Sequence, residues 1–229
     1  MIKKISVILS IFNDQDKLNQ SIESILNQTY TNFELLIIND GSQDNSEKIC
    51  EFYLSKDQRV KYYKNNKNIG LTKSLNILLR NASGELIARQ DSDDTSLNTR
   101  FEKQVEFMKQ NNLDACTTRA KIINSQDITP KKSYYLPKNF VMKFKNPFVH
   151  GSLMINKKVL QDLGGYDERF YYAQDYELMK RFLKTDYKVK IIKTPLYNLN
   201  QTDNISTNHK EEQKYYADCV RKNKVPKLI

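Results

Sequence analysis

The sequence predicts a single α/β domain with a mostly parallel central sheet flanked by helices and a less regular second half. Through the first half, short apolar runs alternate with amphipathic segments, a pattern typical of parallel sheets covered on both faces. Three of the apolar runs lead into polar side chains, at Ser10, Asp40 and Asp91. Ligands bind at the carboxyl ends of such strands. We therefore expect these three residues to share one edge of the sheet.

The elements of the first half follow from apolar spacing and end signals. Asn13 or Asp14 can cap a helix whose apolar residues recur at helical spacing. Asp44 and Glu47 resemble a capping box, and Gly84 is a helix stop signal. Strands are expected at 5–9, 33–38, 60–63 and 86–89, and helices at 15–27, 44–53, 72–83 and 100–110.

The second half is less periodic. Residues 129–148 contain three prolines and predict a loop-rich segment. Residues 1–208 are expected to form one domain, divided into a nucleotide-binding half (1–123) and an acceptor-side half (124–208), with a basic C-terminal helix or tail at 209–229. Strands are expected at 113–118, 121–123, 153–155 and 189–192, helices at 157–163, 176–184 and after 209, and a loop at 198–207.

The composition favours a protein with one buried core and no membrane span. Of the 229 residues, 39% are hydrophobic, enough for one sizeable core. No apolar run reaches the roughly 18 residues of a membrane span, and the N-terminal run is too short for a signal peptide. The three cysteines are scattered, which fits a reducing compartment. We expect a cytoplasmic location, with peripheral contact at the inner face of the plasma membrane as a further expectation.

The net charge of +10 is unevenly distributed. Residues 128–161 contain seven lysines and no acidic residue, with tyrosines and phenylalanines between them. Such a segment attracts phosphates, anionic lipid or nucleic acid. A solvated lysine-rich surface explains the same pattern, and the sequence leaves both readings open.

Three carboxylates crowd into the run Asp91-Ser92-Asp93-Asp94, directly after an apolar strand. Because like charges repel, carboxylates gathered at a strand end indicate an oxygen-ligand site for Mg²⁺ or Mn²⁺. The same tetrapeptide is also a good solvated turn and helix cap.

An ordered set of motifs spans nearly the whole chain and resembles family 2 glycosyltransferases. That resemblance implies a GT-A fold, an inverting reaction and a nucleotide-sugar donor, expected to be UDP-linked. The motifs are residues 10–13, 24–30, 33–42, 68–71, 88–94 and 174–177.

The resemblance also implies roles for residues at the sheet edge. Asp40 matches the carboxylate that hydrogen-bonds uracil, or else it caps its own loop. Asp91 matches the ribose- and diphosphate-side member of the family's acidic motif, and Asp93 the member that binds the divalent cation. Ser10 and Lys73 are expected to border the nucleotide.

Arg89 is expected to pair with either the acidic cluster or the diphosphate. Asp175 matches the catalytic base, although Gln174 stands where the family has a glutamate. Glu177 competes for that role, and both acids also suit an exposed helix start. His150 resembles a residue near the donor sugar or acceptor, and a purely structural role is equally open.

These features predict a metal-dependent glycosyltransferase that acts on a saccharide or lipid-linked acceptor, in bacterial surface polysaccharide, lipooligosaccharide or capsule synthesis. A sugar-phosphate nucleotidyltransferase is one alternative, but residues 10–14 lack the Gly-rich, basic loop it requires. A basic nucleic-acid-binding protein is another, and the acidic sheet edge argues against nucleic acid as a partner.

Overall fold

The computed structural model describes residues 3–125, 127–202 and 209–227. Its strands are β1 (Ile5–Ile11), β2 (Phe33–Asn39), β3 (Val60–Lys64), β4 (Leu86–Asp91), β5 (Thr95–Ser96), β6 (Ala115–Ile122), β7 (Ile128–Thr129), β8 (Met154–Asn156) and β9 (Val189–Leu199). Its α-helices are α1 (Gln15–Leu26), α2 (Ser46–Lys56), α3 (Leu71–Asn81), α4 (Arg100–Gln110), α5 (Lys138–Val141), α6 (Lys157–Asp162), α7 (Gln174–Phe182) and α9 (Lys210–Arg221). Two 3₁₀ turns are η1 (Lys132–Tyr134) and η2 (His150–Ser152).

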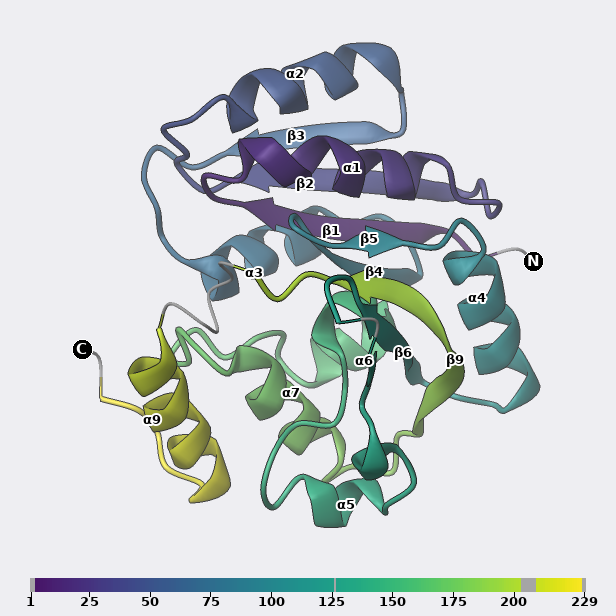
Figure 1. Ribbon diagram of the computed structural model, residues 1–229, viewed down its shortest axis with the longest axis vertical. Helices are drawn as coiled ribbons and strands as arrows, with labels where there is room; N and C mark the ends of the chain where they lie inside the picture. Colours follow the sequence, from purple (N-terminus) through teal and green to yellow (C-terminus); the bar gives the residue numbers. More distant parts are fainter. Residues whose placement is uncertain (1–2, 126, 203–208, 228–229) are drawn as a thin grey trace.

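Within these described residues the strands form one sheet, in the order β3-β2-β1-β4-β8-β6-β9-β5, with β7 beside β6 (Figure 1). The pairs among β3, β2, β1 and β4 are parallel, as is the pair β6–β9. β8 and β5 join the sheet antiparallel. The predicted α/β fold with a mostly parallel sheet is confirmed.

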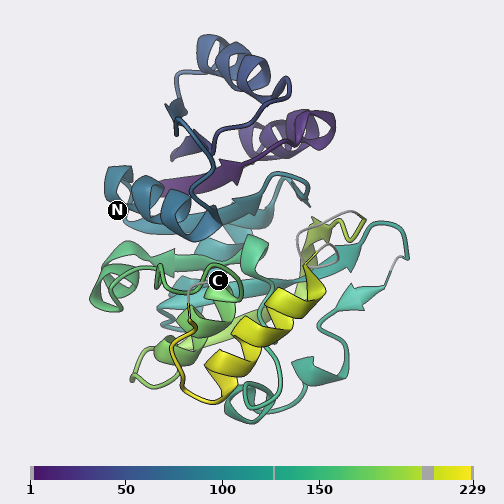
Figure 2. The same cartoon turned by 90° about the vertical axis from the view of Figure 1, so that its left-hand side faces the viewer.

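Alternating side chains of β1 face two separate cores. Val7 and Leu9 pack with α1, α2 and α4, whereas Ile8 packs with α3, α6 and α7. Both faces of the central strands are therefore buried, which explains why these strands are continuous apolar runs. α9 covers α7 on the second face through Tyr216 and Val220 (Figure 2).

The second half departs from the expected strands. The runs at 113–118 and 121–123 are one strand, β6, whose pairing with β9 shifts register around Arg119. That irregularity places a charged residue inside the strand and interrupts its apolar pattern. β9 continues to Leu199, so the predicted loop at 198–207 begins later than expected, and its residues 203–208 lie outside the described part.

Two predicted helix signals act differently from expectation. The carboxylate of Asp44 accepts hydrogen bonds from the backbone N–H of Gln15 (2.9 Å) and of Ser46 (2.9 Å), so it links the starts of α1 and α2. Glu47 pairs with Lys64 instead of closing a capping box. Gly84 lies beyond the end of α3, where a Cβ would come within 2.6 Å of the β1 backbone.

No helix of the described residues is long and apolar enough to cross a membrane.

Candidate functional site

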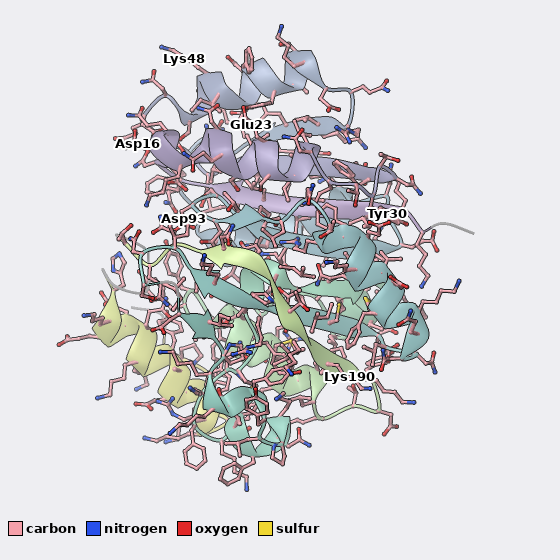
Figure 3. The ribbon with its side chains drawn as sticks, turned by 45° about the vertical axis from the view of Figure 1, so that its right-hand side comes forward. Asp16, Glu23, Tyr30, Lys48, Asp93 and Lys190 are labelled. Carbon is pink, nitrogen blue, oxygen red and sulfur yellow. The ribbon has the colours of Figure 1, made fainter. Side chains whose placement is uncertain are left out.

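The polar residues that follow the first, second and fourth strands lie at one edge of the sheet. Ser10 is the register partner of Asp91 across the β1–β4 pair. The backbone N–H of Asp40 donates to Ile11 at 2.9 Å, across the β1–β2 pair. The expected convergence of these residues at the carboxyl edge is confirmed (Figure 3 labels Asp93, just beyond it).

The acidic cluster at this edge carries unbalanced negative charge. Burial, together with the charges of the neighbouring Asp91 and Asp14, raises the pKa of Asp93 to about 7. Burial also raises the pKa of Asp94, reinforced by Asp91 and Asp93. Carboxylates that hinder one another's ionisation in this way are stabilised by a bound cation. Asp14, expected only as a helix cap, joins the cluster because the chain turns back at the end of β1.

Asp94 fixes the loop that carries the cluster. It does not cap α4, whose N-cap is Thr99. Its Oδ1 accepts a hydrogen bond from the backbone N–H of Asn200 at 2.6 Å, which ties the loop to the end of β9. Asp93 is thereby left as the carboxylate available to a ligand beyond the sheet edge.

The donor set suits a hard divalent cation completed by phosphate oxygens. In the described part of the chain, no three His, Cys, Asp or Glu side chains form a cage that could hold a metal alone. Mg²⁺ sites of nucleotide enzymes typically use one or two carboxylates together with substrate phosphates and water. Asp93, with Asp91 beside it, fits that arrangement.

Two buried arginines support the cluster from below. Arg89 forms an ion pair with Asp91 and also donates to the backbone oxygens of Ile8 (2.8 Å) and Gln90 (2.9 Å). Of its two expected partners, the structure provides the acidic cluster, and its contact with a diphosphate stays a prediction. Arg100 donates to the backbone oxygens of Arg89 (2.8 Å) and Gly151 (3.2 Å).

One sign of this network is visible in the sequence itself. Arg89 and Gln90 interrupt a buried strand, and Gln90 donates to the backbone oxygen of Asp94 at 2.8 Å. Polar residues inside a buried strand require buried partners. Other partners of Gln90 include Ser21 of α1, Ser96 of β5 and Arg100 of α4, and nothing in their spacing reveals that they meet.

Tyr197 and Gly151 shape the space beside Asp91. The hydroxyl of Tyr197 accepts a hydrogen bond from the backbone N–H of Asp91 at 3.1 Å. A Cβ at Gly151 would collide with that hydroxyl and lie 2.5 Å from Oδ2 of Asp91. Neighbouring His150 bonds to the Tyr166 hydroxyl at 2.9 Å, and burial followed by the charge of Arg89 lowers its pKa. His150 is therefore an uncharged ring, and its contact with a donor or acceptor stays a prediction.

Asp40 organises the loop that leads into α3. Its Oδ1 accepts from the backbone of Ile69 (3.0 Å) and the side chain of Asn65 (2.8 Å), and its Oδ2 accepts from Gly70 (2.9 Å). The loop-capping role is thus present in the structure, and a contact with uracil stays a prediction. Lys73 is exposed on the first turn of α3, next to this loop.

The two candidate bases differ in their partners. Asp175 accepts a hydrogen bond from the Asn146 amide at 2.8 Å. Burial raises its pKa, and the charge of Asp91 adds to that effect. Glu177 forms an ion pair with Arg181 at 2.6 Å, and this arginine also donates to the backbone oxygen of Gly165 at 2.9 Å. The geometry favours Asp175 as a proton acceptor because its only side-chain partner in the described chain is neutral.

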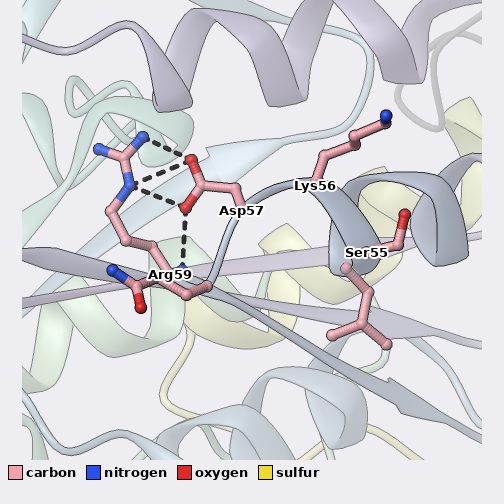
Figure 4. A pocket seen from close by; sticks show the side chains of 6 residues that line it. Ser55, Lys56, Asp57 and Arg59 are labelled. Atoms are coloured by element: carbon pink, nitrogen blue, oxygen red, sulfur yellow. Dashed lines mark hydrogen bonds and ion pairs between the residues drawn. The ribbon is translucent and has the colours of Figure 1, made fainter.

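A separate surface hollow lies at the opposite edge of the sheet. It is formed by residues 54–59, in the turn from α2 to β3, and contains the ion pair of Asp57 with Arg59 (Figure 4). The turn precedes β3 and so belongs to the amino edge, away from the acidic cluster. Asp57 and Arg59 are already paired with each other, and the hollow shares no residue with the site.

Sequence comparison places residues 6–164 within the model of the family described as "Glycosyl transferase family 2". The O-antigen biosynthesis glycosyltransferase WbnJ of Escherichia coli is 40% identical over 184 residues, covering 78% of this chain and 71% of WbnJ. The UDP-Glc:alpha-D-GlcNAc-diphosphoundecaprenol beta-1,3-glucosyltransferase WfgD of Escherichia coli is 31% identical over 223 residues, covering 94% of this chain and 85% of WfgD.

Structural comparison finds the same architecture in the mannosyltransferase PcManGT of Pyrobaculum calidifontis, solved in complex with GDP-Man and Mn²⁺. The TM-score is 0.72 at 16% identity, and the match covers 99% of this chain. This chain spans 66% of the length of that mannosyltransferase. At this identity the similarity shows the fold.

Proposed function

The chain belongs to glycosyl transferase family 2, and from this premise we propose that it moves one sugar from a UDP-linked donor to an acceptor hydroxyl with inversion. The acceptor class is a saccharide or a lipid-linked saccharide, in assembly of a bacterial surface polysaccharide, lipooligosaccharide or capsule. The acidic cluster at the carboxyl edge is the observation that carries this proposal. The names of WbnJ and WfgD support the biosynthetic context.

The donor would bind across the carboxyl edge. Asp40 and the loop it organises, together with Ser10 and Lys73, would border the base and ribose. Asp93, next to Asp91, would hold Mg²⁺ or Mn²⁺ against the diphosphate. When bound, the cation neutralises charge that develops on the leaving diphosphate. Arg89 would act through Asp91, since its guanidinium is buried and ion-paired there.

Asp175 would act as the general base from the acceptor side. The acceptor oxygen attacks the anomeric carbon on the face opposite the diphosphate, and the bond from that carbon to the diphosphate oxygen breaks. Asp175 takes the hydroxyl proton as the new glycosidic bond forms. The Asn146 amide would hold the carboxylate towards the acceptor, and Glu177 would remain paired with Arg181.

Calorimetry of UDP binding, with and without Mn²⁺, tests the donor site. Asp93→Asn should abolish the gain in affinity from Mn²⁺, a loss of roughly 10-fold or more. Asp40→Ala should weaken UDP binding under both conditions because the loop loses its anchor. Glu51→Gln, which removes an exposed carboxylate of α2, is the matched control.

Unchanged UDP affinity in both variants would falsify the site assignment. GDP serves as the comparison ligand, and tighter binding of GDP than of UDP contradicts the proposed donor class.

A further inference from the structure

A group of large apolar side chains is exposed around α5. Tyr135, Leu136, Phe140 and Phe144 are 71%, 45%, 50% and 61% exposed, and we call them the aromatic end. The rings of Phe140 and Phe144 lie edge to face, 5.4 Å apart. Apolar side chains gathered in this way on a surface mark an interaction site.

The lysines around the aromatic end divide into two kinds. Lys138 is half-buried and donates to the backbone oxygens of Ser133 and Leu136, so it has a structural role. Lys132, Lys143 and Lys145 are exposed and pair with no carboxylate in the part of the chain that the structure describes. Their charges are available to an anionic partner.

The C-terminal end of α9 extends the same surface. Arg221 donates to the backbone oxygen of Phe144 at 3.0 Å, which brings the two segments together. Lys222, Lys224 and Lys227 follow it and are exposed. α5 and this end of α9 lie at one end of the molecule and α2 at the other (Figures 1 and 2).

We propose that the aromatic end, with its flanking lysines, docks onto the surface of an anionic lipid bilayer. Exposed rings suit the boundary between headgroups and acyl chains, and unpaired lysines suit anionic headgroups. A nucleic acid would be bound through the lysines alone, and a protein partner would be bound through a packed apolar patch. An anionic bilayer contacts exposed lysines and exposed apolar side chains on the same surface. Exposed lysines mixed with exposed rings are therefore explained best by lipid.

The aromatic end is connected to the candidate base, Asp175, through a short stretch of chain. Asn146 lies two residues after Phe144 and donates to Asp175. A lipid-linked acceptor held in the bilayer would approach the site from this side. That link depends on the proposed function, but the docking itself does not, since vesicle binding is measured without donor or acceptor.

Vesicle sedimentation with the full chain tests the proposal. We expect binding to phosphatidylcholine vesicles that contain about one third phosphatidylglycerol, at least ~10-fold weaker binding to pure phosphatidylcholine, and loss of binding at high salt. Phe140→Ser/Phe144→Ser and Lys143→Gln/Lys145→Gln should each weaken binding by roughly 10-fold.

The opposite end of the molecule offers matched controls. Phe52 is 54% exposed on α2, and Lys56 lies over its ring. Lys48, labelled in Figure 3, is exposed on the same helix four residues before Phe52. Phe52→Ser and Lys48→Gln/Lys56→Gln should leave vesicle binding unchanged. UDP binding by every variant reports that the protein is folded and keeps the test separate from the donor site.

Equal binding to neutral and anionic vesicles at low salt overturns the proposal. So does an equal loss of binding in the α2 variants. A protein that binds single-stranded RNA but not anionic vesicles has a nucleic-acid surface instead.

Discussion

A buried glutamate lies at the amino edge of the sheet and a cluster of aspartates lies at its carboxyl edge, and the two differ in their partners. At the amino edge, Glu34 accepts hydrogen bonds from the Ser6 hydroxyl (2.5 Å) and the Ser83 backbone N–H (2.7 Å), and pairs with Lys61 at 2.8 Å. Burial alone would raise the pKa of Glu34, but Lys61 and these donors lower it by more. At the carboxyl edge, burial and the charge of Asp91 raise the pKa of Asp93 to about 7.

If the proposed function is correct, the difference separates a structural charge from one that a bound ligand would compensate. Glu34 is surrounded by donors from β1, β3 and the turn before β4, so its negative charge is fully compensated within the protein. The acids at the carboxyl edge face one another, and Arg89 offsets only Asp91. Burial alone does not distinguish a structural carboxylate from a ligand-binding one. The hydrogen-bond and ion-pair partners within the protein do.

The largest expected effect concerns Asp175, the acid across from the carboxyl edge. Asp175→Asn keeps the shape and removes the proton acceptor. Turnover should fall by about 10²–10⁴-fold while UDP affinity stays within a few-fold. The measurement is steady-state kinetics with an identified donor and acceptor, beside calorimetry.

Glu177→Gln is the control for Asp175 and should have a smaller effect, because its carboxylate is paired with Arg181. Near-normal turnover in Asp175→Asn together with a large loss in Glu177→Gln would make Glu177 the base.

The second effect in size is the loss of stability on removing Glu34. Glu34→Ala leaves the buried Ser6 hydroxyl without its acceptor and also removes the acceptor of the Ser83 N–H. Because Lys61 is half-exposed, most of the cost comes from these hydrogen bonds, and we expect about 3 kcal/mol less free energy of unfolding. Urea denaturation at neutral pH measures it, with Glu51→Gln as the control. A loss of unfolding free energy below ~1 kcal/mol would show that Glu34 has no large structural role, and the contrast with the carboxyl edge would fail.

The pH dependence of the Glu34 contribution has a definite sign. The pKa of Glu34 is lower in the folded protein than its ordinary 4.5. The ionised carboxylate therefore stabilises the protein fully above that pH, and the contribution is lost as the pH falls towards the folded pKa. The gap between wild type and Glu34→Gln should narrow only in acid.

The smallest expected effect has the opposite sign. Asp93→Asn relieves repulsion within the acidic cluster and should raise the free energy of unfolding by about 1 kcal/mol in chelator. Since the folded pKa is raised from 3.8 to about 7, the gain should be absent below pH 3.8 and grow towards pH 7. Mn²⁺ with UDP should reverse it, because only the wild type gains from binding. A destabilised Asp93→Asn protein in chelator would mean that Asp93 is structural, like Glu34.

The sequence predicted the carboxyl edge because strand direction alone brings Ser10, Asp40 and Asp91 together. It did not predict how the edge is fixed. Gln90 is held by residues from α1 and α4, Asp94 is held by Asn200 just after β9, and Asn146 reaches Asp175 from a loop-rich segment. Such contacts depend on packing between distant segments, which periodicity does not encode. The capping box at Asp44 failed for a related reason, since its carboxylate bonds to α1 as well as α2.

The tie between the acidic loop and β9 also sets an order of events during protein synthesis. Thr95 pairs with Asn198 across β5 and β9, and Asp94 accepts from Asn200, which lies 106 residues later in the chain. A ribosome must therefore synthesise and release the chain as far as Asn200 before the loop can take its final shape. A nascent chain that stops before Asn200 can pair β1 to β4, but its acidic residues lack their anchor. The acidic loop is thus completed only after the β1–β4 part of the sheet can form.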